Sequence, residues 1–238
     1  DATTRNIDVE ALAVKLEQAS VANLLPKALI VVHFSGLSCE MQTIQTLAKK
    51  YSVILIEDAA HALGGSYQQQ KIGSCQFSDM TVLSFHPVKS ITSAEGGAVL
   101  TNNQGFNGEI KLLAKHGVTR DASQMVTASQ GPWYYQQVAL GYNYRLSDLH
   151  AALGLSQLGK LDTFIQRRTE LALRYQQQLA ALPLTLPTLS AQSKSAWHIY
   201  MVEVTEHQRK AVYEALHKKG VGVNVHYIPI HLHPYYQQ

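Results

Sequence analysis

Hydrophobic residues recur along this chain in two spacings, which predict alternating strands and helices. Continuous apolar runs at 28–33 and 53–56 are typical of strands that are covered on both faces. Apolar residues three and four positions apart predict helices at 8–19 and 41–48. A strand, a helix and a second strand in this order form a right-handed parallel unit, with chemistry expected at the carboxyl ends of its strands.

The remaining pattern extends this alternation and then changes character. The predicted elements are a loop with room for a short hairpin at 64–79, strands at 81–83 and 98–101, and a helix at 104–115. A helical region follows at 147–182, in which Gly154 and Gly159 indicate close packing or a bend. The last elements are a strand at 199–204, a helix at 208–218 with Gly220 as its C-cap, and a strand at 221–226. We therefore expect an α/β fold. Residues 1–159 form a mostly parallel central sheet with flanking helices, and residues 160–238 form a smaller α+β domain.

Composition narrows the class of protein. Hydrophobic residues make up 46% of the 238 positions and charged residues 16%, which indicates a well-packed globular chain. The net charge of +3 comes from scattered basic residues, so we expect no nucleic-acid partner. Cys39 and Cys75 have neither metal-site nor disulfide-framework spacing, so we expect no metal and a reducing cytoplasm. We also expect neither a membrane span nor a signal peptide.

Residues 81–97 carry the first candidate chemistry. The strand at 81–83 leads into Ser84 and His86, and Pro87 then disfavours a helix or a continued central strand. Lys89 follows on a tight loop between two strands. Lysines in loops are usually solvated, but burial here lowers the pKa of the amine and makes it a nucleophile suited to Schiff-base chemistry.

Asp58 ends a predicted strand upstream of Lys89, and His33 ends another. Pyridoxal phosphate requires a lysine for the Schiff base, an acid for its pyridine nitrogen, and hydroxyls or amides for its phosphate. The acid strengthens the ring as an electron sink, and the released lysine can move a proton between carbons. Lys89, Asp58 and Ser84 together therefore predict a site for this cofactor.

Four ordered motifs resemble a known family. They are Ile56-Glu-Asp-Ala-Ala-His-Ala-Leu-Gly64, Ser84-Phe-His-Pro-Val-Lys89, Ala94-Glu-Gly-Gly97 and Leu140-Gly-Tyr-Asn-Tyr-Arg-Leu-Ser-Asp148. Over nearly the whole chain they look like the nucleotide-sugar aminotransferases of the DegT type, which are fold-type-I pyridoxal phosphate enzymes. With the run from His226 to Leu232, the lysine motif looks most like the branch that serves pseudaminic acid synthesis. The resemblance implies transfer of an amino group from glutamate to C4 of a UDP-linked 4-keto-6-deoxy-N-acetylhexosamine.

The resemblance also implies roles for single residues. Lys89 would form the Schiff base, Asp58 would pair with the pyridinium nitrogen, and His61 would lie against the ring near its phenolic oxygen. Ser84 would bind the phosphate, and Asn143 would reach the cofactor of a neighbouring subunit, which implies a homodimer with shared active sites. The expected substrate-binding residues are His33, His86, His226, Tyr227 and His231. Structural alternatives stay open: a turn cap for Asp58, a core histidine for His61, a strand-end hydroxyl for Ser84 and a turn residue for Asn143.

The chain also departs from the family pattern. Relatives carry a segment before the position of Asp1, with a helix start that binds phosphate and an aromatic residue that stacks on the cofactor. We therefore expect the chain to be truncated at both ends. Leu37-Ser38 and Glu40 replace the Gly-Gln and Asp that often follow the preceding motif in relatives. The alternatives are a UDP-4-keto-pentose aminotransferase, an inactive truncated homologue, and a sugar dehydratase, whose relatives replace the lysine with histidine.

Overall fold

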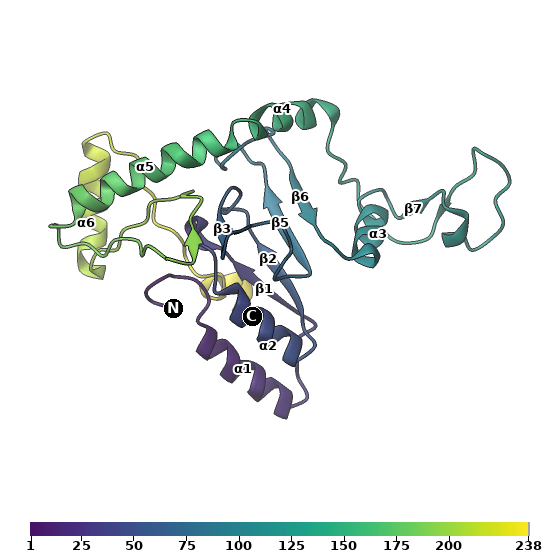
Figure 1. The fold of residues 1–238 in the computed structure, drawn as a ribbon, viewed down its shortest axis with the longest axis horizontal. Coiled ribbons are helices and arrows are strands. Elements are labelled where there is room, and N and C mark those ends of the chain that lie inside the picture. Colours follow the sequence, from purple (N-terminus) through teal and green to yellow (C-terminus); the bar gives the residue numbers. More distant parts are fainter. Residues whose placement is uncertain (238) are drawn as a thin grey trace.

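A four-stranded sheet lies at the centre of the fold (Figure 1). The computed structural model describes residues 1–237. The strands lie in the order β1-β2-β5-β6 and span Ala28–Val32, Ile54–Asp58, Met80–Ser84 and Gly97–Leu100. β1, β2 and β5 run parallel, whereas β6 pairs antiparallel with β5. The predicted mostly parallel sheet is thus confirmed, with one antiparallel edge strand.

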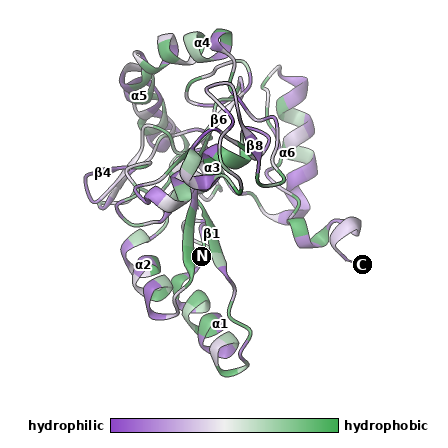
Figure 2. Ribbon diagram, turned by 90° about the vertical axis from the view of Figure 1, so that its right-hand side faces the viewer, coloured by the Kyte–Doolittle hydropathy of each residue, from purple (hydrophilic) through white to green (hydrophobic). Residues whose placement is uncertain are grey.

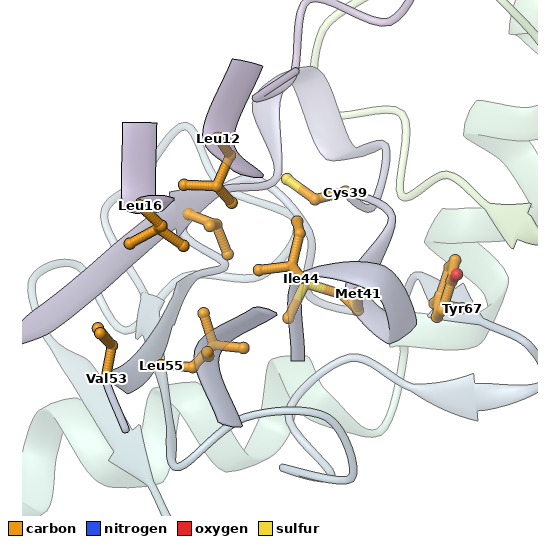
Figure 3. Packing of buried hydrophobic residues seen from close by; sticks show 10 residues of the cluster. Leu12, Leu16, Cys39, Met41, Ile44, Val53, Leu55 and Tyr67 are labelled. Carbon is orange, nitrogen blue, oxygen red and sulfur yellow. The ribbon is translucent and has the colours of Figure 1, made fainter. Parts of the chain in front are cut away.

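Two helices cover one face of this sheet. α1 (Val9–Val21) begins at Asp8, whose carboxylate accepts a hydrogen bond from the Ala11 amide at 2.8 Å. α2 (Met41–Lys50) connects β1 to β2. Figure 3 shows the core that they enclose, which contains Leu12, Leu16, Cys39, Met41, Ile44, Val53, Leu55 and Tyr67. Fully burying each large aliphatic side chain stabilises the fold by about 1.5–3 kcal/mol.

The opposite face of the sheet is exposed at β1 and half-buried at β2, so the prediction of strands covered on both faces is wrong for β1. Val31 in β1 is 1% exposed, but its neighbours Ile30 and Val32 are 61% and 44% exposed. Successive side chains of a strand point to opposite faces, and α1 and α2 pack only on the side of Val31 and Leu55. An apolar run therefore does not show how many faces of a strand are covered. Figure 2 shows β1 as hydrophobic along its length.

Short elements extend from the main sheet. The predicted hairpin is present as β3 (Ser66–Tyr67) and β4 (Gln70–Lys71), and β9 (Ser193–Lys194) joins β3. The others are α3 (Gln104–Leu113), β7 (Val118–Thr119), β8 (Gln136–Gln137) and the 3-10 helices η1 (Phe34–Gly36), η2 (Ala122–Gln124), η3 (Ile230–Leu232) and η4 (Pro234–Tyr236).

The predicted helical region at 147–182 forms two helices. α4 (Asp148–Leu158) begins at Ser147, whose hydroxyl accepts from the His150 amide at 3.3 Å. α5 (Leu161–Leu179) follows after a break at Gly159 and Lys160, which confirms the predicted bend. The break coincides with the predicted domain boundary near residue 160, and the division into two domains stays a prediction. No helix of the described chain is both long and apolar enough to cross a bilayer.

Two predicted strands in the last third are not formed. Residues 199–204 make one isolated bridge, between Glu203 and Thr185, and residues 221–226 belong to no strand. An extended segment becomes a strand only when its backbone pairs along a neighbour, and neither segment has such a neighbour among the described residues. The helix between them is confirmed as α6 (Glu206–Lys218), and Gly220 follows its end with a φ of 77°.

Candidate functional site

Asp58 is held at the carboxyl edge of the central sheet. It is the last residue of β2 and pairs with Val32 of β1 and Val82 of β5. Its carbonyl oxygen accepts from the His33 amide at 3.1 Å, and its side-chain oxygen accepts from the Ala60 amide at 3.0 Å. Because β1, β2 and β5 are parallel, their carboxyl ends meet at this edge. The Asp58 carboxylate therefore lies where the sequence predicted chemistry.

Lys89 lies in the loop between β5 and β6, at the same edge. Ser84, which ends β5, pairs with Gly97 at the start of β6, so the loop leaves and re-enters the sheet at one point. The Lys89 amide donates to the His86 carbonyl at 3.0 Å, which closes a turn. Burial lowers the pKa of the Lys89 amine, and the nearby negative charge of Asp58 opposes this effect. Lys89 is thus a partly buried amine within the electrostatic reach of Asp58.

Two histidines whose rings contact each other at a tilt lie beside this pair. The rings of His61 and His198 are 4.3 Å apart between centroids. The Ser35 amide donates to Nδ1 of His61 at 3.3 Å, so this nitrogen is an acceptor and carries no proton. Burial lowers the pKa of His61 to about 4, and the positive charge of Lys89 acts in the same direction. The structure therefore places His61 in the Lys89 site as a neutral imidazole.

His33 lies inside the protein, although we predicted it as a substrate-binding residue. Its side chain is fully buried, with Nε2 2.7 Å from Glu57 and Nδ1 accepting from the Cys39 amide at 3.2 Å. Both ring nitrogens are therefore used within the protein. The structure does not place His33 where a substrate could reach it, because the segment after β1 folds back over its ring.

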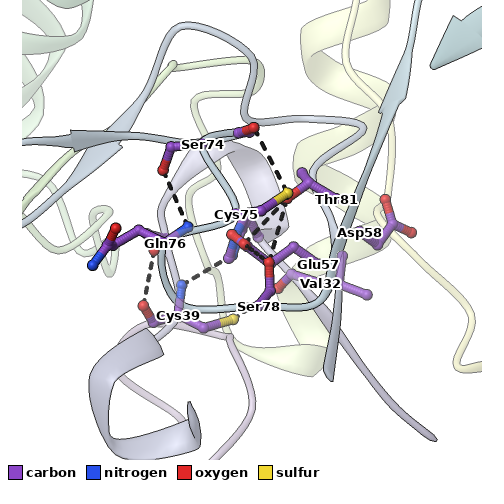
Figure 4. Close-up of polar contacts among 12 residues, drawn as sticks. Val32, Cys39, Glu57, Asp58, Ser74, Cys75, Gln76, Ser78 and Thr81 are labelled. Carbon is purple, nitrogen blue, oxygen red and sulfur yellow. Dashed lines mark hydrogen bonds and ion pairs between the residues drawn. The ribbon is translucent and has the colours of Figure 1, made fainter. Parts of the chain in front are cut away.

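Glu57 is the centre of a buried polar network behind the site (Figure 4). Besides His33, the hydroxyls of Ser78 and Thr81 donate to its carboxylate. Burial alone would raise the pKa of Glu57, but these hydrogen bonds outweigh it and lower the pKa. Glu57 thus anchors β1 to β5 just before Asp58, while Asp58 itself turns toward the sheet edge.

The structure brings several other predicted residues near Lys89. Ser84 accepts from the His86 amide through its hydroxyl at 3.4 Å. His86 is exposed, and its Nδ1 accepts from the Val88 amide at 3.4 Å. His226 lies close enough for its charge to lower the pKa of His61. Tyr227 packs edge-on against Phe34, 6.0 Å away between centroids, and Phe34 in turn lies against His61.

Two predicted residues do not join this group. Asn143 lies on an exposed segment after the excursion that contains β7 and β8, and its side-chain oxygen accepts from Arg145 at 3.1 Å. His231 is exposed in η3. No contact with Lys89, Asp58 or His61 is present for either residue in the described chain.

His198 and Arg168 join the site without having been predicted. Arg168, from α5, donates through one guanidinium nitrogen to the carbonyls of Trp197 at 3.0 Å and His198 at 3.3 Å. The run from Trp197 to Tyr200, rich in ring side chains, was the available signal in the sequence. The predicted strand at 199–204 included only Ile199 and Tyr200 of this run, and neither Trp197 nor His198 was given a role.

Known proteins resemble this chain over its whole length. The DegT/DnrJ/EryC1/StrS aminotransferase family matches residues 1–238. The UDP-4-amino-4,6-dideoxy-N-acetyl-beta-L-altrosamine transaminase of Campylobacter jejuni is 38% identical over 98% of this chain and 59% of its own length. Helicobacter pylori PseC, an aminotransferase involved in the biosynthesis of pseudoaminic acid, superposes with a TM-score of 0.85 at 36% identity, over 98% of this chain and 59% of its own.

A third relative was solved in a form named for its cofactor. A putative sugar aminotransferase from Streptococcus pneumoniae, solved in its PLP form, superposes with a TM-score of 0.82 at 26% identity, over 100% of this chain and 62% of its own. This chain spans about three fifths of the length of the curated relatives it matches. The likeness confirms the predicted fold-type-I architecture. Sequence and structure agree that the chain belongs to the DegT/DnrJ/EryC1/StrS aminotransferase family.

Proposed function

We propose that this chain carries the lysine-bearing part of a pyridoxal phosphate-dependent sugar-nucleotide aminotransferase. The reaction moves an amino group from glutamate to C4 of a UDP-linked 4-keto-6-deoxy-N-acetylhexosamine, as in pseudaminic acid biosynthesis. The names of the Campylobacter and Helicobacter relatives support this substrate class. The observation that carries the proposal is the partly buried Lys89 amine with Asp58 at the same sheet edge.

The residues present fit pyridoxal phosphate. The cofactor needs an amine that is readily deprotonated, and burial lowers the pKa of Lys89. It also needs a carboxylate, and Asp58 provides one that is fixed by the Ala60 amide. When bound, the cofactor supplies a conjugated ring that takes up the electrons left by removal of the Cα proton.

The chain's own residues would each have a separate role in the reaction. Lys89, as a free base, would move a proton between the substrate carbon and the cofactor carbon: away from Cα of glutamate in the first half-reaction and onto C4 of the sugar in the second. The Asp58 carboxylate would pair with the pyridinium nitrogen of the cofactor. His61 would lie against the ring as a neutral imidazole, because burial lowers its pKa to about 4. The Ser84 hydroxyl, at the end of β5, is the phosphate ligand that this chain offers.

The proposal extends to a second subunit and to the cellular compartment. Asn143 serves the cofactor site of a second subunit, because in this chain it lies away from Lys89 on an exposed segment. A homodimer with shared active sites is thus part of the proposal. We place the reaction in the cytoplasm, which suits the two free, buried cysteines Cys39 and Cys75.

A substrate panel tests the proposed function. The chain, supplied with pyridoxal phosphate and glutamate, should form at most one equivalent of 2-oxoglutarate by itself. It should form 2-oxoglutarate over repeated turnovers only when a UDP-linked 4-keto sugar is also present. We expect the 6-deoxy-N-acetylhexosamine to react faster than the 4-keto pentose, and Lys89→Ala to abolish turnover. Lys111→Ala, which changes an exposed lysine of α3, is the matched control. Faster reaction of the pentose would overturn the substrate assignment, and turnover by Lys89→Ala would overturn the role of Lys89.

A further inference from the structure

Ser35 uses all three of its polar groups to connect η1 with two segments that are distant in the sequence. Its amide donates to Nδ1 of His61 at 3.3 Å. Its carbonyl accepts from the amides of His198 at 3.0 Å and Ile199 at 3.3 Å, and its hydroxyl donates to the Ile199 carbonyl at 2.6 Å. Ser35 is therefore the residue through which the segment after β9 and His61 are held together.

The backbone of Ser35 is held in the left-handed region, with a φ of 63° and a ψ of -3°. Residues other than glycine adopt this region rarely, and they keep it only where their surroundings determine it. Here the hydrogen bonds of the carbonyl and the hydroxyl fix Ser35 against Ile199. The direction of the Ser35 amide is thus set by the fold, independently of its contact with His61.

This amide decides which nitrogen of His61 carries the proton. A neutral imidazole has one donor and one acceptor nitrogen, and the bond made by one nitrogen fixes the state of the other. Nδ1 is the acceptor, because the Ser35 N–H group donates to it. Burial, and after it the positive charge of Lys89, oppose a second proton on the ring and lower the pKa of His61 to about 4. The single proton of His61 is therefore on Nε2.

Nε2 of His61 is accessible to a ligand. His61 is half-buried, and its Nε2 makes no hydrogen bond with any described residue. None of the shielded, unpaired side-chain atoms of the described chain belongs to His61, so solvent reaches this nitrogen. The opposite charges of Lys89 and Asp58 both act on the ring. His61 thus offers one accessible N–H donor next to the two residues that fit the cofactor.

We propose that Ser35 is a positioning residue of the Lys89 site, whose amide holds His61 in the tautomer with its proton on Nε2 and so makes His61 a hydrogen-bond donor to pyridoxal phosphate. The inference rests on the proposed function for the identity of that ligand. The phenolic oxygen, near which the sequence predicts His61, is a hydrogen-bond acceptor. In the other tautomer, Nε2 would present a lone pair to that oxygen and repel it.

The first test measures the tautomer in the wild-type chain without cofactor. Nitrogen-15 spectra at pH 7 should show a protonated Nε2 and an unprotonated Nδ1 for His61. A coupling transmitted through the hydrogen bond should also connect Nδ1 with the amide nitrogen of Ser35. Neither observation depends on cofactor binding or on activity, and both are made on the unmodified protein.

Two changes at position 35 then separate the amide from the hydroxyl. Ser35→Gly removes the hydroxyl, keeps the amide and suits the left-handed backbone. Replacing Ser35 with the corresponding hydroxy acid turns its amide into an ester, which keeps the hydroxyl and removes the N–H group. The same ester at Ser129 is the matched control, because the amide of this exposed serine makes no hydrogen bond in the described chain. Binding of pyridoxal phosphate is measured by calorimetry for each protein.

The affinity is expected to follow the N–H group and not the hydroxyl. The ester at position 35 should weaken binding of pyridoxal phosphate about fivefold to tenfold, which is the usual effect of one lost hydrogen bond. It should also convert His61 to a mixture of tautomers. Ser35→Gly should keep the proton on Nε2 and bind less than about twofold more weakly than the wild-type chain. The ester at Ser129 should change neither the tautomer nor the affinity.

Each contrary result has a distinct meaning. A proton on Nδ1 of His61 in the wild-type chain, or wild-type affinity in the ester at position 35, would overturn the inference and leave the proposed function standing. Equal weakening in Ser35→Gly would do the same, because the lost hydroxyl would then account for the effect. Failure of the wild-type chain to bind pyridoxal phosphate would overturn the inference and the proposed function together.

Discussion

At the scale of single residues, the structure separates two adjacent carboxylates by their surroundings. Glu57 points into the core, where His33, Ser78 and Thr81 saturate it. Asp58, the next residue of β2, ends the strand at the sheet edge within reach of Lys89. Alternation along the strand thus assigns one carboxylate to stability and the other to chemistry.

Replacing Glu57 with glutamine should destabilise the fold by about 1–3 kcal/mol, because an amide nitrogen then faces donors that have lost their acceptor. Urea unfolding at pH 7 measures the effect, with Glu109→Gln on the exposed face of α3 as the control. The pKa of Glu57 is lowered in the folded chain, so its contribution is present above the unfolded value of 4.5 and disappears as the pH falls below that value. A variant as stable as the control at pH 7 would contradict this account.

His61 and His198 should make stability depend on pH in a different window. Their folded pKa values, about 4 for His61 and about 3 for His198, lie below the ordinary value of 6.5. The unfolded chain therefore binds more protons than the folded chain below pH 6.5, and stability should fall as the pH decreases from 7 to 5. Urea midpoints in that range should change less for His198→Asn than for the wild-type chain. Equal slopes would contradict the lowered pKa of His198.

At the scale of elements, the site depends on how closely η1 approaches the segment that follows β9. Gly36 ends η1 with a φ of 104°, and a Cβ at this position would lie 2.9 Å from the Trp197 amide nitrogen and 3.2 Å from that of His198. Only glycine suits both the backbone conformation and the space. The fold thus uses one glycine to bring His198 against His61.

Gly36→Ala should therefore weaken both the fold and the site. We expect a loss of about 1–3 kcal/mol in the free energy of unfolding, of the size seen for strained backbone positions. We also expect the His61 nitrogen-15 signals to change, because the contact between the rings of His61 and His198 opens. Gly108→Ala is the matched control, since nothing lies within 4 Å of its Cβ and alanine favours a helix by roughly 0.5–1 kcal/mol over glycine. Equal behaviour of the two variants would refute the role assigned to Gly36.

At the scale of the whole molecule, local patterns predicted the elements well and long-range contacts poorly. Apolar runs and helical spacing located β1, β2, β5, β6 and α1 to α3, because those signals lie within each segment. They could not show that one face of the sheet is exposed, or that residues 199–204 lack a strand partner. His198 was missed for the same reason. Its place depends on Ser35 and Arg168, which are far away in the sequence.

The site residues divide in the same way, into those that local patterns reveal and those that depend on long-range contacts. Asp58, Ser84 and Lys89 were predictable because each stands at or just after the end of a strand, and parallel strands bring those ends together. His33 had the same signal, yet its ring turns inward to Glu57. The direction of a side chain after a strand end depends on the following turn, here η1, which periodicity does not reveal.

The most direct test is to locate the cofactor-bearing lysine chemically. The chain is mixed with pyridoxal phosphate, reduced with borohydride, digested, and analysed by mass spectrometry. The account predicts a visible absorption band that reduction removes, and one pyridoxyl group on the peptide that contains Lys89. Lys89→Ala should lose both, whereas Lys111→Ala should retain them. Labelling spread over surface lysines, or unchanged in Lys89→Ala, would contradict the claim that Lys89 is the centre of the site.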